Sequence, residues 1–388
     1  MFRLSGKRRG GVFAVADVAS GSAGVAIIET HPHGPARILA AHRAVLSLED
    51  RSPEATISGV IAVLEEAAQK SLEQYSARAD KSQPHVSAAY AIIRAPWSHS
   101  RAIRKSSTFE TETKIADDVI AQLGHEALKE AGGADTSEIF ETSVVRVQLN
   151  GYPTAHPVAK SAHHAEVAVL VSDCDPKIRS GVSEALTKIF ACPPPTLRSG
   201  TRALLSVLRE NTLLPSECFV VNMTSHGTSF VAVRKSIVAE TITIPEGSRS
   251  IIGRVASGKM PEETLSLLRL VALDQCEHTA CESLLQALAQ AEPALVKAFG
   301  EAMTKVSSAR RLPNTLVLSA HEDLAPWLAH FLSKIDFSQF TMTTRPFSVR
   351  VLTKDDLSGI VAPVTPAQSD IGLIVASALV NIEKQADS

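Results

Sequence analysis

Apolar and polar residues form a distinct pattern near the start of the chain, between Val12 and Glu29. The stretch is apolar except at its centre, where Asp17 ends the first apolar run and a bend follows. That bend contains Ser20, Gly21 and Ser22. Two apolar runs joined by glycine and serine are typical of a β-hairpin, and successive backbone N–H groups in such a bend can bind an anion. The pattern therefore predicts either a plain hairpin that begins a sheet, with Asp17 solvated at its tip, or a hairpin that cradles a phosphate.

The same pattern returns about two hundred residues later, over Cys218–Arg234. An apolar run ends at Asn222, a polar bend continues to Thr228, and a second apolar run follows. Each of the two patterns precedes a further apolar run, at 36–47 and at 235–244. The sequence therefore predicts two copies of one three-stranded β unit, because self-similarity along a chain indicates a repeated structural unit.

The rest of the chain alternates between runs with helical spacing and shorter apolar runs typical of strands. We expect helices over 53–75, 115–131, 176–190, 198–210, parts of 248–311, 324–333 and 369–384. We expect further strands over 86–96, 143–149, 165–171, 314–319 and 347–352. Asn150 and Gly151, which tolerate a positive φ, predict a tight turn after the second of these strands. A polar stretch that ends in proline, 76–84, predicts a boundary.

The composition is that of a globular protein large enough for two or more domains, with 388 residues of which 45% are hydrophobic. The formal net charge of −2 gives no indication of nucleic acid as a partner. The five cysteines lack the spacing of a disulfide framework, so we expect free thiols and a reducing compartment. Because the sequence shows neither a signal peptide nor an apolar run of about 18 residues, we expect a cytoplasmic protein.

Two hairpin turns from related domains, followed by a strand-to-helix turn near the C-terminus, resemble the nucleotide clamp of the actin-like ATPase superfamily. The segment 17–22 stands where the family has its first phosphate motif, 222–228 stands at the second, and 318–323 stands at the adenosine motif. The resemblance implies an actin-like α/β fold, a ribonuclease H-like duplicated two-domain fold that binds ATP and Mg²⁺. It implies that Asp17 holds the metal through water, and that the nucleotide contacts Asp17, Ser20, Gly21, Ser22, Asn222, Gly227, Thr228, Ala320 and His321.

The order of elements between residues 85 and 175 resembles that of one group within the superfamily. A strand-helix-strand-strand subdomain inserted into the first domain, with a proline-bearing hairpin at 149–153, resembles the bacterial FtsA and PilM group. The group implies a first actin-like domain at 1–84 and 176–215, the inserted subdomain at 85–175, and a second domain at 216–388 that is mainly helical over 248–312.

The same group implies a scaffold that is peripheral to the inner membrane and acts in type IV pilus assembly or in cell division. Its partners would be other proteins, bound through the inserted subdomain, or further copies of the chain. A division protein of the FtsA type would end in a basic amphipathic helix, but 369–384 has few basic residues and is expected to pack in the core. This difference favours the PilM-like role.

Each of the three motifs departs from the family pattern. Ala19 replaces a glycine, Asn222 replaces a carboxylate, and glycines are also replaced at Thr224 and at Ala320–His321. An amide cannot act as a general base, so we expect hydrolysis to suffer more than binding and ATPase activity to be weak or absent, with no catalytic residue assigned. Two alternatives stay open: an active phosphotransferase or ATPase of the sugar-kinase and actin superfamily, and a structural homologue without a ligand.

Other candidate chemistry in the sequence is weaker. Cys276, His278 and Cys281 lie close together, but on a helix their spacing does not gather them on one face, so we expect no metal there. The sequence contains no Gly-x-Ser-x-Gly, Walker or His-Glu-x-x-His motif. The usual hydrolase and metalloprotease functions are therefore excluded.

Overall fold

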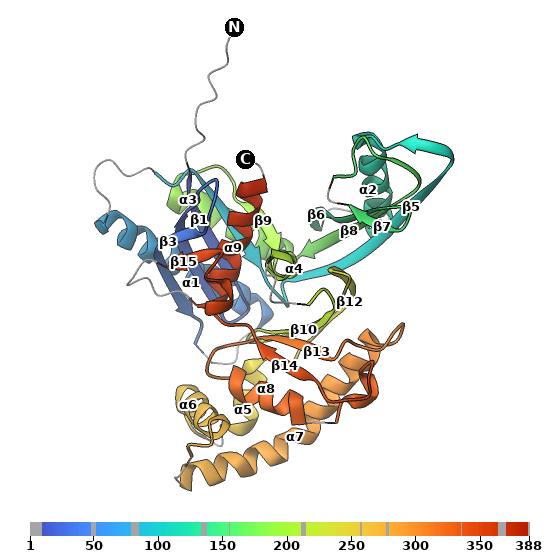
Figure 1. Cartoon of the computed structure of the whole chain (residues 1–388). Helices are drawn as coiled ribbons and strands as arrows, with labels where there is room; N and C mark the ends of the chain where they lie inside the picture. The colour runs from blue at the N-terminus through green and yellow to red at the C-terminus, as the bar shows by residue number, and fades with distance from the viewer. Residues whose placement is uncertain are drawn as a thin grey trace.

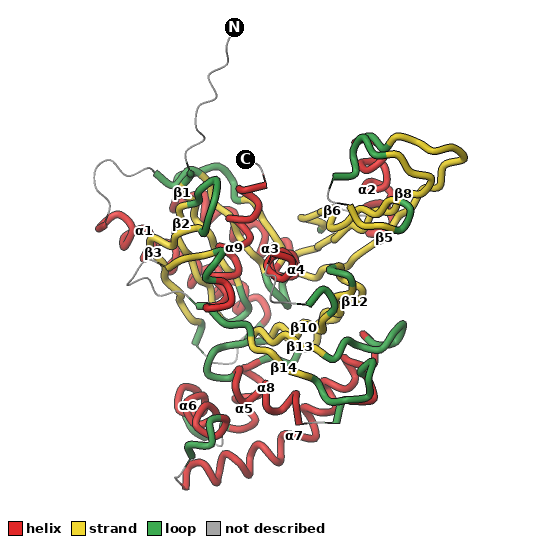
Figure 2. Tube along the Cα trace, in the orientation of Figure 1, coloured by secondary structure: helices red, strands yellow, loops and turns green. Residues whose placement is uncertain are grey.

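A computed structural model describes residues 10–47, 52–78, 85–132, 138–154, 156–210, 215–256, 258–276, 279–334, 336–363 and 370–386 of the chain. These residues form three β-sheets and the helices that pack on them (Figure 1). Two sheets lie in the body of the molecule, and the third projects from it together with one helix (Figure 2).

The first sheet contains the N-terminal hairpin. Its strands, in sheet order, are β15 (Val361–Pro363), β3 (Ala36–Val45), β2 (Ser22–Glu29), β1 (Val12–Val18), β4 (Ala88–Ile93) and β9 (Thr196–Ser199). β1, β2 and β3 are antiparallel neighbours, and β4 runs parallel to β1. Successive side chains of β1 point to opposite faces, so Ala14 packs with helices α1 (Pro53–Arg78) and α3 (Pro176–Phe190). Val15 packs on the other face with α4 (Gly200–Glu210) and α9 (Ile371–Ala386).

The second sheet repeats the three-stranded unit. Its strands, in sheet order, are β12 (Ile237–Ile244), β11 (Thr228–Arg234), β10 (Cys218–Met223), β13 (Thr315–Ser319) and β14 (Ser348–Val351). One face is covered by α5 (Ser248–Val255), α6 (Pro261–Ala272), α7 (Thr279–Val306) and α8 (Ala325–Lys334). Two short 3₁₀ helices, η1 (Ser338–Phe340) and η2 (Asp355–Leu357), lie near β14 in the chain.

A single buried cluster joins the two large sheets. Val15 and Ile28 of the first sheet, Val220 and Val317 of the second, and the apolar residues of α4 and α9 all belong to it. α9 is buried over Gly372–Asn381, which confirms that the last helix packs in the core. Among the described residues, no helix has the length and apolar character needed to cross a membrane.

The third sheet is small and projects from the body (Figure 1). In sheet order it consists of β5 (Ser98–Lys114), β8 (Ser161–Cys174), β6 (Ile139–Leu149) and β7 (Tyr152–Thr154). α2 (Asp117–Gly132) packs on one face, where Leu123 and Ala127 meet Val167 and Val169. The other face packs on the body, because Leu170 belongs to the cluster that contains α4.

The structure confirms the two related hairpin units and most of the expected helices, but two assignments of strands were wrong. No strand was expected between 96 and 115, yet β5 is a strand whose outer half is exposed on alternate residues. The strand expected at 86–96 belongs to the first sheet as β4 rather than to the small sheet. The sequence also gave no signal for the short strands β9 and β15.

The expectation that all cysteines are free is wrong for one pair. Cys276 and Cys281 form a disulfide, with Cα atoms 5.9 Å apart. Cys276 precedes α7 instead of lying on it, so helical spacing does not apply to the pair. Cys174, Cys192 and Cys218 are free and buried. His278 lies outside the described residues, and among the described residues no group of three or more His, Cys, Asp and Glu side chains could hold a metal ion.

Candidate functional site

The two hairpin turns have the same local structure. In the first, Ala19 N–H donates to the carbonyl of Ser22 over 3.0 Å, and in the second, Thr224 N–H donates to the carbonyl of Gly227 over 2.8 Å. Each bond closes a two-residue loop between antiparallel strands, β1 and β2 in one case and β10 and β11 in the other. The repeated pattern in the sequence thus produces two matching turns.

The two turns contact each other directly. The Oγ of Ser20 lies 3.2 Å from the Oγ1 of Thr224 and accepts a 2.9 Å hydrogen bond from the backbone N–H of His226. A Cβ on Gly21 would overlap the side chain of Ser225, so the close approach of the turns depends on glycine at this position. The two turns are therefore packed directly against each other, with no gap between them at Ser20, Gly21 and Ser225.

Thr224 adds a third point of contact between the two units. Its hydroxyl is 3.0 Å from the carbonyl of Ala95, which follows β4 of the first sheet. It is also 3.0 Å from the carbonyl of Gly227 in its own turn, and the side chain is buried. Thr224 thus connects the second turn to the end of β4 in the first sheet.

Asp17 lies at the end of β1 and is paired with two arginines. Its carboxylate oxygens accept hydrogen bonds of 2.6 Å from the Nε of Arg94 and of 2.6 Å from an Nη of Arg43. The Asp17 side chain is only 1% exposed. Burying a carboxylate is costly unless it is paired and hydrogen-bonded, and the two guanidinium groups supply both.

Arg43 also binds the start of α9. It donates to the Oγ of Ser22 over 2.8 Å and to both carboxylate oxygens of Asp370. Burial favours protonation of Asp370, but the charge of Arg43 and hydrogen bonds from Arg43 and from the Leu373 N–H outweigh it, so the pKa of Asp370 is lowered. Although burial of Arg43 opposes its charge, Asp370 and Asp17 raise the pKa of the guanidinium. Two carboxylates and two guanidinium groups thus balance each other.

Part of the predicted site comes together around one small cavity of about 150 Å³. Asp17, Ser22, Ala320 and His321 line it, and so do Arg43, Arg94 and Asp370, which sequence analysis did not select. A signal existed for Arg94, because it directly follows a strand parallel to β1 and the carboxyl ends of parallel strands meet at one edge. Arg43 and Asp370 gave no such signal.

The remaining predicted residues do not line that cavity. Ser20 and Gly21 are occupied in the contact between the turns. Thr228 donates a 2.6 Å hydrogen bond to the carbonyl of Glu246. Asn222 is buried, and its side-chain oxygen has no hydrogen-bond partner among the described residues. The amide at this position therefore neither contacts the cavity nor closes the turn.

Comparison with known proteins gives structural matches only. No family model matches the sequence, and no curated protein matches it. The structure is similar to a chain of the PilM-PilN type IV pilus biogenesis complex, with a TM-score of 0.59 and 11% identity over 97% of this chain and 99% of that one. The two related three-stranded units agree with this match. The chain has the actin-like fold.

Two other solved structures have lower TM-scores. The ethanolamine utilization protein EutJ from Carboxydothermus hydrogenoformans has a TM-score of 0.44 and 12% identity, over 96% of this chain and 91% of its own. A ROK family glucokinase from Streptomyces griseus, in complex with glucose and AMPPNP, has a TM-score of 0.35 and 11% identity, over 95% of this chain and 99% of its own.

The actin-like cleft of this chain does not fit a magnesium nucleotide as its residues now lie. Both oxygens of Asp17 accept hydrogen bonds from guanidinium cations, so the carboxylate is already paired with positive charge. The cavity of about 150 Å³ is smaller than the roughly 300–1,000 Å³ of typical ligand sites. A Cβ on Gly372 would overlap Asp17 as well, which shows how closely α9 approaches the carboxylate.

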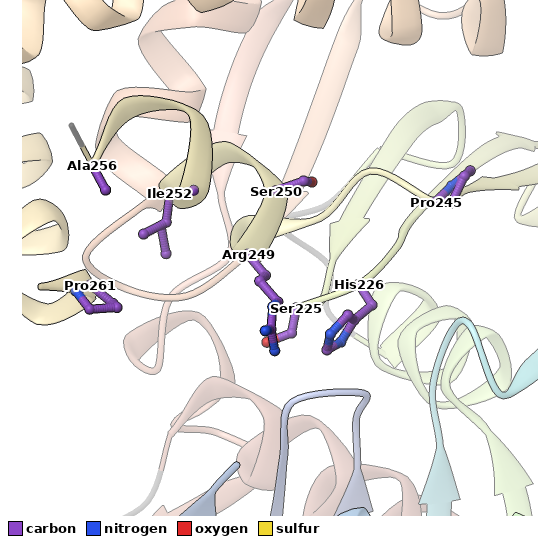
Figure 3. A pocket seen from close by; sticks show the side chains of 9 residues that line it. Ser225, His226, Pro245, Arg249, Ser250, Ile252, Ala256 and Pro261 are labelled. Atoms are coloured by element: carbon purple, nitrogen blue, oxygen red, sulfur yellow. The ribbon is translucent and has the colours of Figure 1, made fainter. Parts of the chain in front are cut away.

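A larger cavity borders the second turn of the actin-like cleft. It measures about 430 Å³ and lies between the turn and α5, with Ser225 lining both cavities. In Figure 3 the side chain of Arg249 projects from α5 toward Ser225 and His226. Burial and the charge of Arg249 lower the pKa of His226, so its ring is neutral at pH 7. The second turn therefore separates a small, charged cavity from a larger one.

Proposed function

We propose that this chain is an actin-like scaffold protein that binds another protein and keeps its cleft closed with its own residues instead of a nucleotide. The observation that carries the proposal is the direct contact between the two hairpin turns at Ser20, Thr224 and His226. In this arrangement hydroxyl groups and a backbone N–H satisfy each other across the cleft. In this proposal the chain keeps the actin-like fold and uses it to bind a protein partner.

The charges in the cleft support the same proposal. Arg43 and Arg94 neutralise the charge of Asp17, so the carboxylate that would hold a Mg²⁺ ion has no uncompensated negative charge. Asn222 carries no negative charge and cannot accept a proton from water. Nucleotide hydrolysis therefore has neither a metal position nor a base among these residues.

Within this function, the PilM-like role in type IV pilus assembly is the one that we favour over a division role. The PilM-PilN structure is a complex of two proteins, and its match to this chain extends over nearly the whole length of both chains. We propose a cytoplasmic protein, peripheral to the inner membrane, whose small sheet of β5 to β8 contributes to partner binding. Association with further copies of the chain is a second mode that the fold allows.

Calorimetric titration with Mg-ATP tests the closed cleft. We expect no saturable heat and no release of phosphate at nucleotide concentrations up to about 5 mM, because the two turns already contact each other across the cleft. A ligand that does not bind the folded state also cannot stabilise it. The melting temperature should also be unchanged by Mg-ATP and by EDTA. Saturable micromolar binding or steady turnover would contradict the proposal.

The rival function, an active phosphotransferase, is tested by restoring the missing charge. Asn222→Asp places a carboxylate at the position where the family has one. We expect no gain in hydrolysis, because the turns still contact each other and Asp17 is still paired with two arginines. A variant that hydrolyses ATP at a measurable rate would support the enzyme instead.

The scaffold itself is tested by binding purified products of the neighbouring genes to the immobilised chain. We expect one of them to bind with a Kd of about 1 μM or tighter, equally well with and without Mg-ATP. Binding that requires Mg-ATP would show a nucleotide switch and overturn the proposed mechanism. Absence of binding by all of them would overturn the scaffold role.

A further inference from the structure

A groove with three cationic side chains runs between the small sheet and the body of the molecule. It has a volume of about 510 Å³, and Arg146 of β6, Arg209 of α4 and Lys235 of the β11–β12 turn line it. Its other lining residues are Val145, Pro153, Thr154, Ser216 and Ser236, so no acidic side chain lies among them. The groove thus gathers positive charge from three separate elements.

The two arginines are fixed in place by backbone carbonyls. Arg146 donates to the carbonyl of Lys235, and the Nε of Arg209 donates to the carbonyl of Ser236 over 2.9 Å. Lys235 and Ser236 both have a positive φ, of 50° and 60°, in a two-residue turn where Asn-Gly is usual. The arginines therefore hold an unfavourable turn at the wall of the groove.

The cations are poorly compensated. Burial of the guanidinium and the charges of Arg202 and Arg146 lower the pKa of Arg209 to about 10, so it is still charged at pH 7. Burial and the charge of Arg104 lower the pKa of Arg146, with a smaller opposing effect from Glu166. The Nε of Arg146 is buried and has no hydrogen-bond partner among the described residues. An anion in the groove would offset the repulsion between these cations.

The groove also follows the edge of a strand. β7 pairs with β6 over Val147–Leu149 and ends at Thr154. Among the described residues no strand continues β7 along the preceding part of β6, where Val145 and Arg146 line the groove. The register of β6 on β8 shifts between Val144 and Arg146, and bulges of this kind redirect side chains at sheet edges. Unpaired strand edges are templates for an added strand.

We propose that this groove binds an extended acidic segment of a protein partner, which adds to β6 in line with β7 and places its carboxylates against Arg146, Arg209 and Lys235. The proposal rests on the scaffold function above and names the chemistry of its partner. Main-chain hydrogen bonds to the edge would give affinity, and alternate side chains of the segment would face the cations. A peptide that alternates acidic and β-favouring residues matches both requirements.

The test uses the full chain and a fluorescein-labelled peptide of alternating Glu and Thr, about ten residues long. We expect saturable binding by fluorescence anisotropy, weakened by at least about fivefold when salt rises from about 50 to about 500 mM. A Lys–Thr peptide of the same length should not bind. A Glu–Thr peptide with proline at two central Thr positions should bind about tenfold more weakly, since proline cannot donate to the strand edge.

Lys235→Glu is the decisive variant, because the Lys235 side chain is exposed and only its backbone carbonyl accepts from Arg146. We expect it to weaken the Glu–Thr peptide about tenfold. Lys188→Glu makes the same charge change at an exposed position of α3, outside the groove lining, and should leave binding unchanged. Equal binding by the two variants, or equal affinity for a DNA oligonucleotide of the same charge, would overturn the proposal.

Failure of this inference is distinguishable from failure of the scaffold function. If a purified partner binds the chain and Lys235→Glu does not weaken it, the groove proposal is wrong while the scaffold stands. If the acidic peptide binds in the groove and all candidate partners fail to bind, the groove stands and the scaffold role is wrong.

Discussion

At the scale of single residues, the turns of the cleft are held together by side chains of the chain itself. Asp17, the residue on which metal binding would depend, is held by Arg43 and Arg94. Ser20 and Thr224, one from each hairpin turn, lie within hydrogen-bond distance of each other. These contacts are internal, so they contribute to the stability of the folded chain.

Arg94→Met tests how much the buried ion pair between Arg94 and Asp17 contributes to the stability of the fold. The variant leaves Asp17, which is 1% exposed, with one guanidinium instead of two, and we expect the free energy of unfolding to fall by about 3 kcal/mol. Arg269→Met removes an exposed arginine that is 3.3 Å from Asp323, and it should cost less than about 1 kcal/mol. Urea unfolding measures both. A loss at Arg94 no larger than at Arg269 would show that the pair is not important.

Gly21→Ala tests the contact between the turns. The added methyl group would overlap Ser225, so we expect a loss of roughly 1–3 kcal/mol in the free energy of unfolding. Gly124→Ala is the control, since a Cβ there meets nothing within 4 Å and alanine favours the helix by roughly 0.5–1 kcal/mol. Combining Gly21→Ala with Ser225→Gly should restore most of the loss, and failure to do so would place the strain elsewhere.

At the scale of elements, the hairpins were predictable and the charged network was not. Continuous apolar runs on either side of a short polar bend were enough to find β1, β2, β10 and β11, because strands buried on both faces are apolar along their whole length. β5 was missed since its outer half carries polar residues on both faces, and apolar periodicity cannot mark such a strand. The pair of Arg43 and Asp370 was missed because the two residues are 327 positions apart, and sequence spacing does not encode such a contact.

The start of α9 is the element most directly coupled to the cleft. Asp370 accepts a 3.0 Å hydrogen bond from the Leu373 N–H at the first turn of the helix and also binds Arg43. Anions at the N-terminus of a helix are stabilised by the helix dipole and by the N–H groups there. The last helix, which packs against the core of both large sheets, is therefore tied to the first hairpin by one carboxylate.

The lowered pKa of Asp370 gives this contact a pH dependence. A carboxylate whose pKa falls on folding stabilises the folded state in full above its ordinary pKa of about 3.9, and the contribution is lost as the pH falls through the lowered value. We expect the unfolding free energy of the wild type to decline below about pH 4 more steeply than that of Asp370→Asn. Unfolding curves of the two proteins at matched pH values measure this. Parallel declines would mean that Asp370 does not titrate with folding.

At the scale of the whole molecule, one buried cluster passes from the first sheet through α4 and α9 to the second. In an actin-like protein with a nucleotide between its domains, the ligand connects the two halves and its loss can open them. Here the apolar cluster and the contacts between the turns already connect the halves. The chain is therefore expected to behave as one rigid body that presents fixed surfaces, among them the groove beside the small sheet.

Hydrogen exchange of the amides in the two turns, followed by mass spectrometry with and without Mg-ATP, tests this account most directly. The account predicts that the amides of 18–22 and 223–228 are protected in the protein without nucleotide, because the turns are closed on each other, and that Mg-ATP leaves their exchange unchanged. Rapid exchange of both turns without nucleotide, followed by strong protection when Mg-ATP is added, would contradict it.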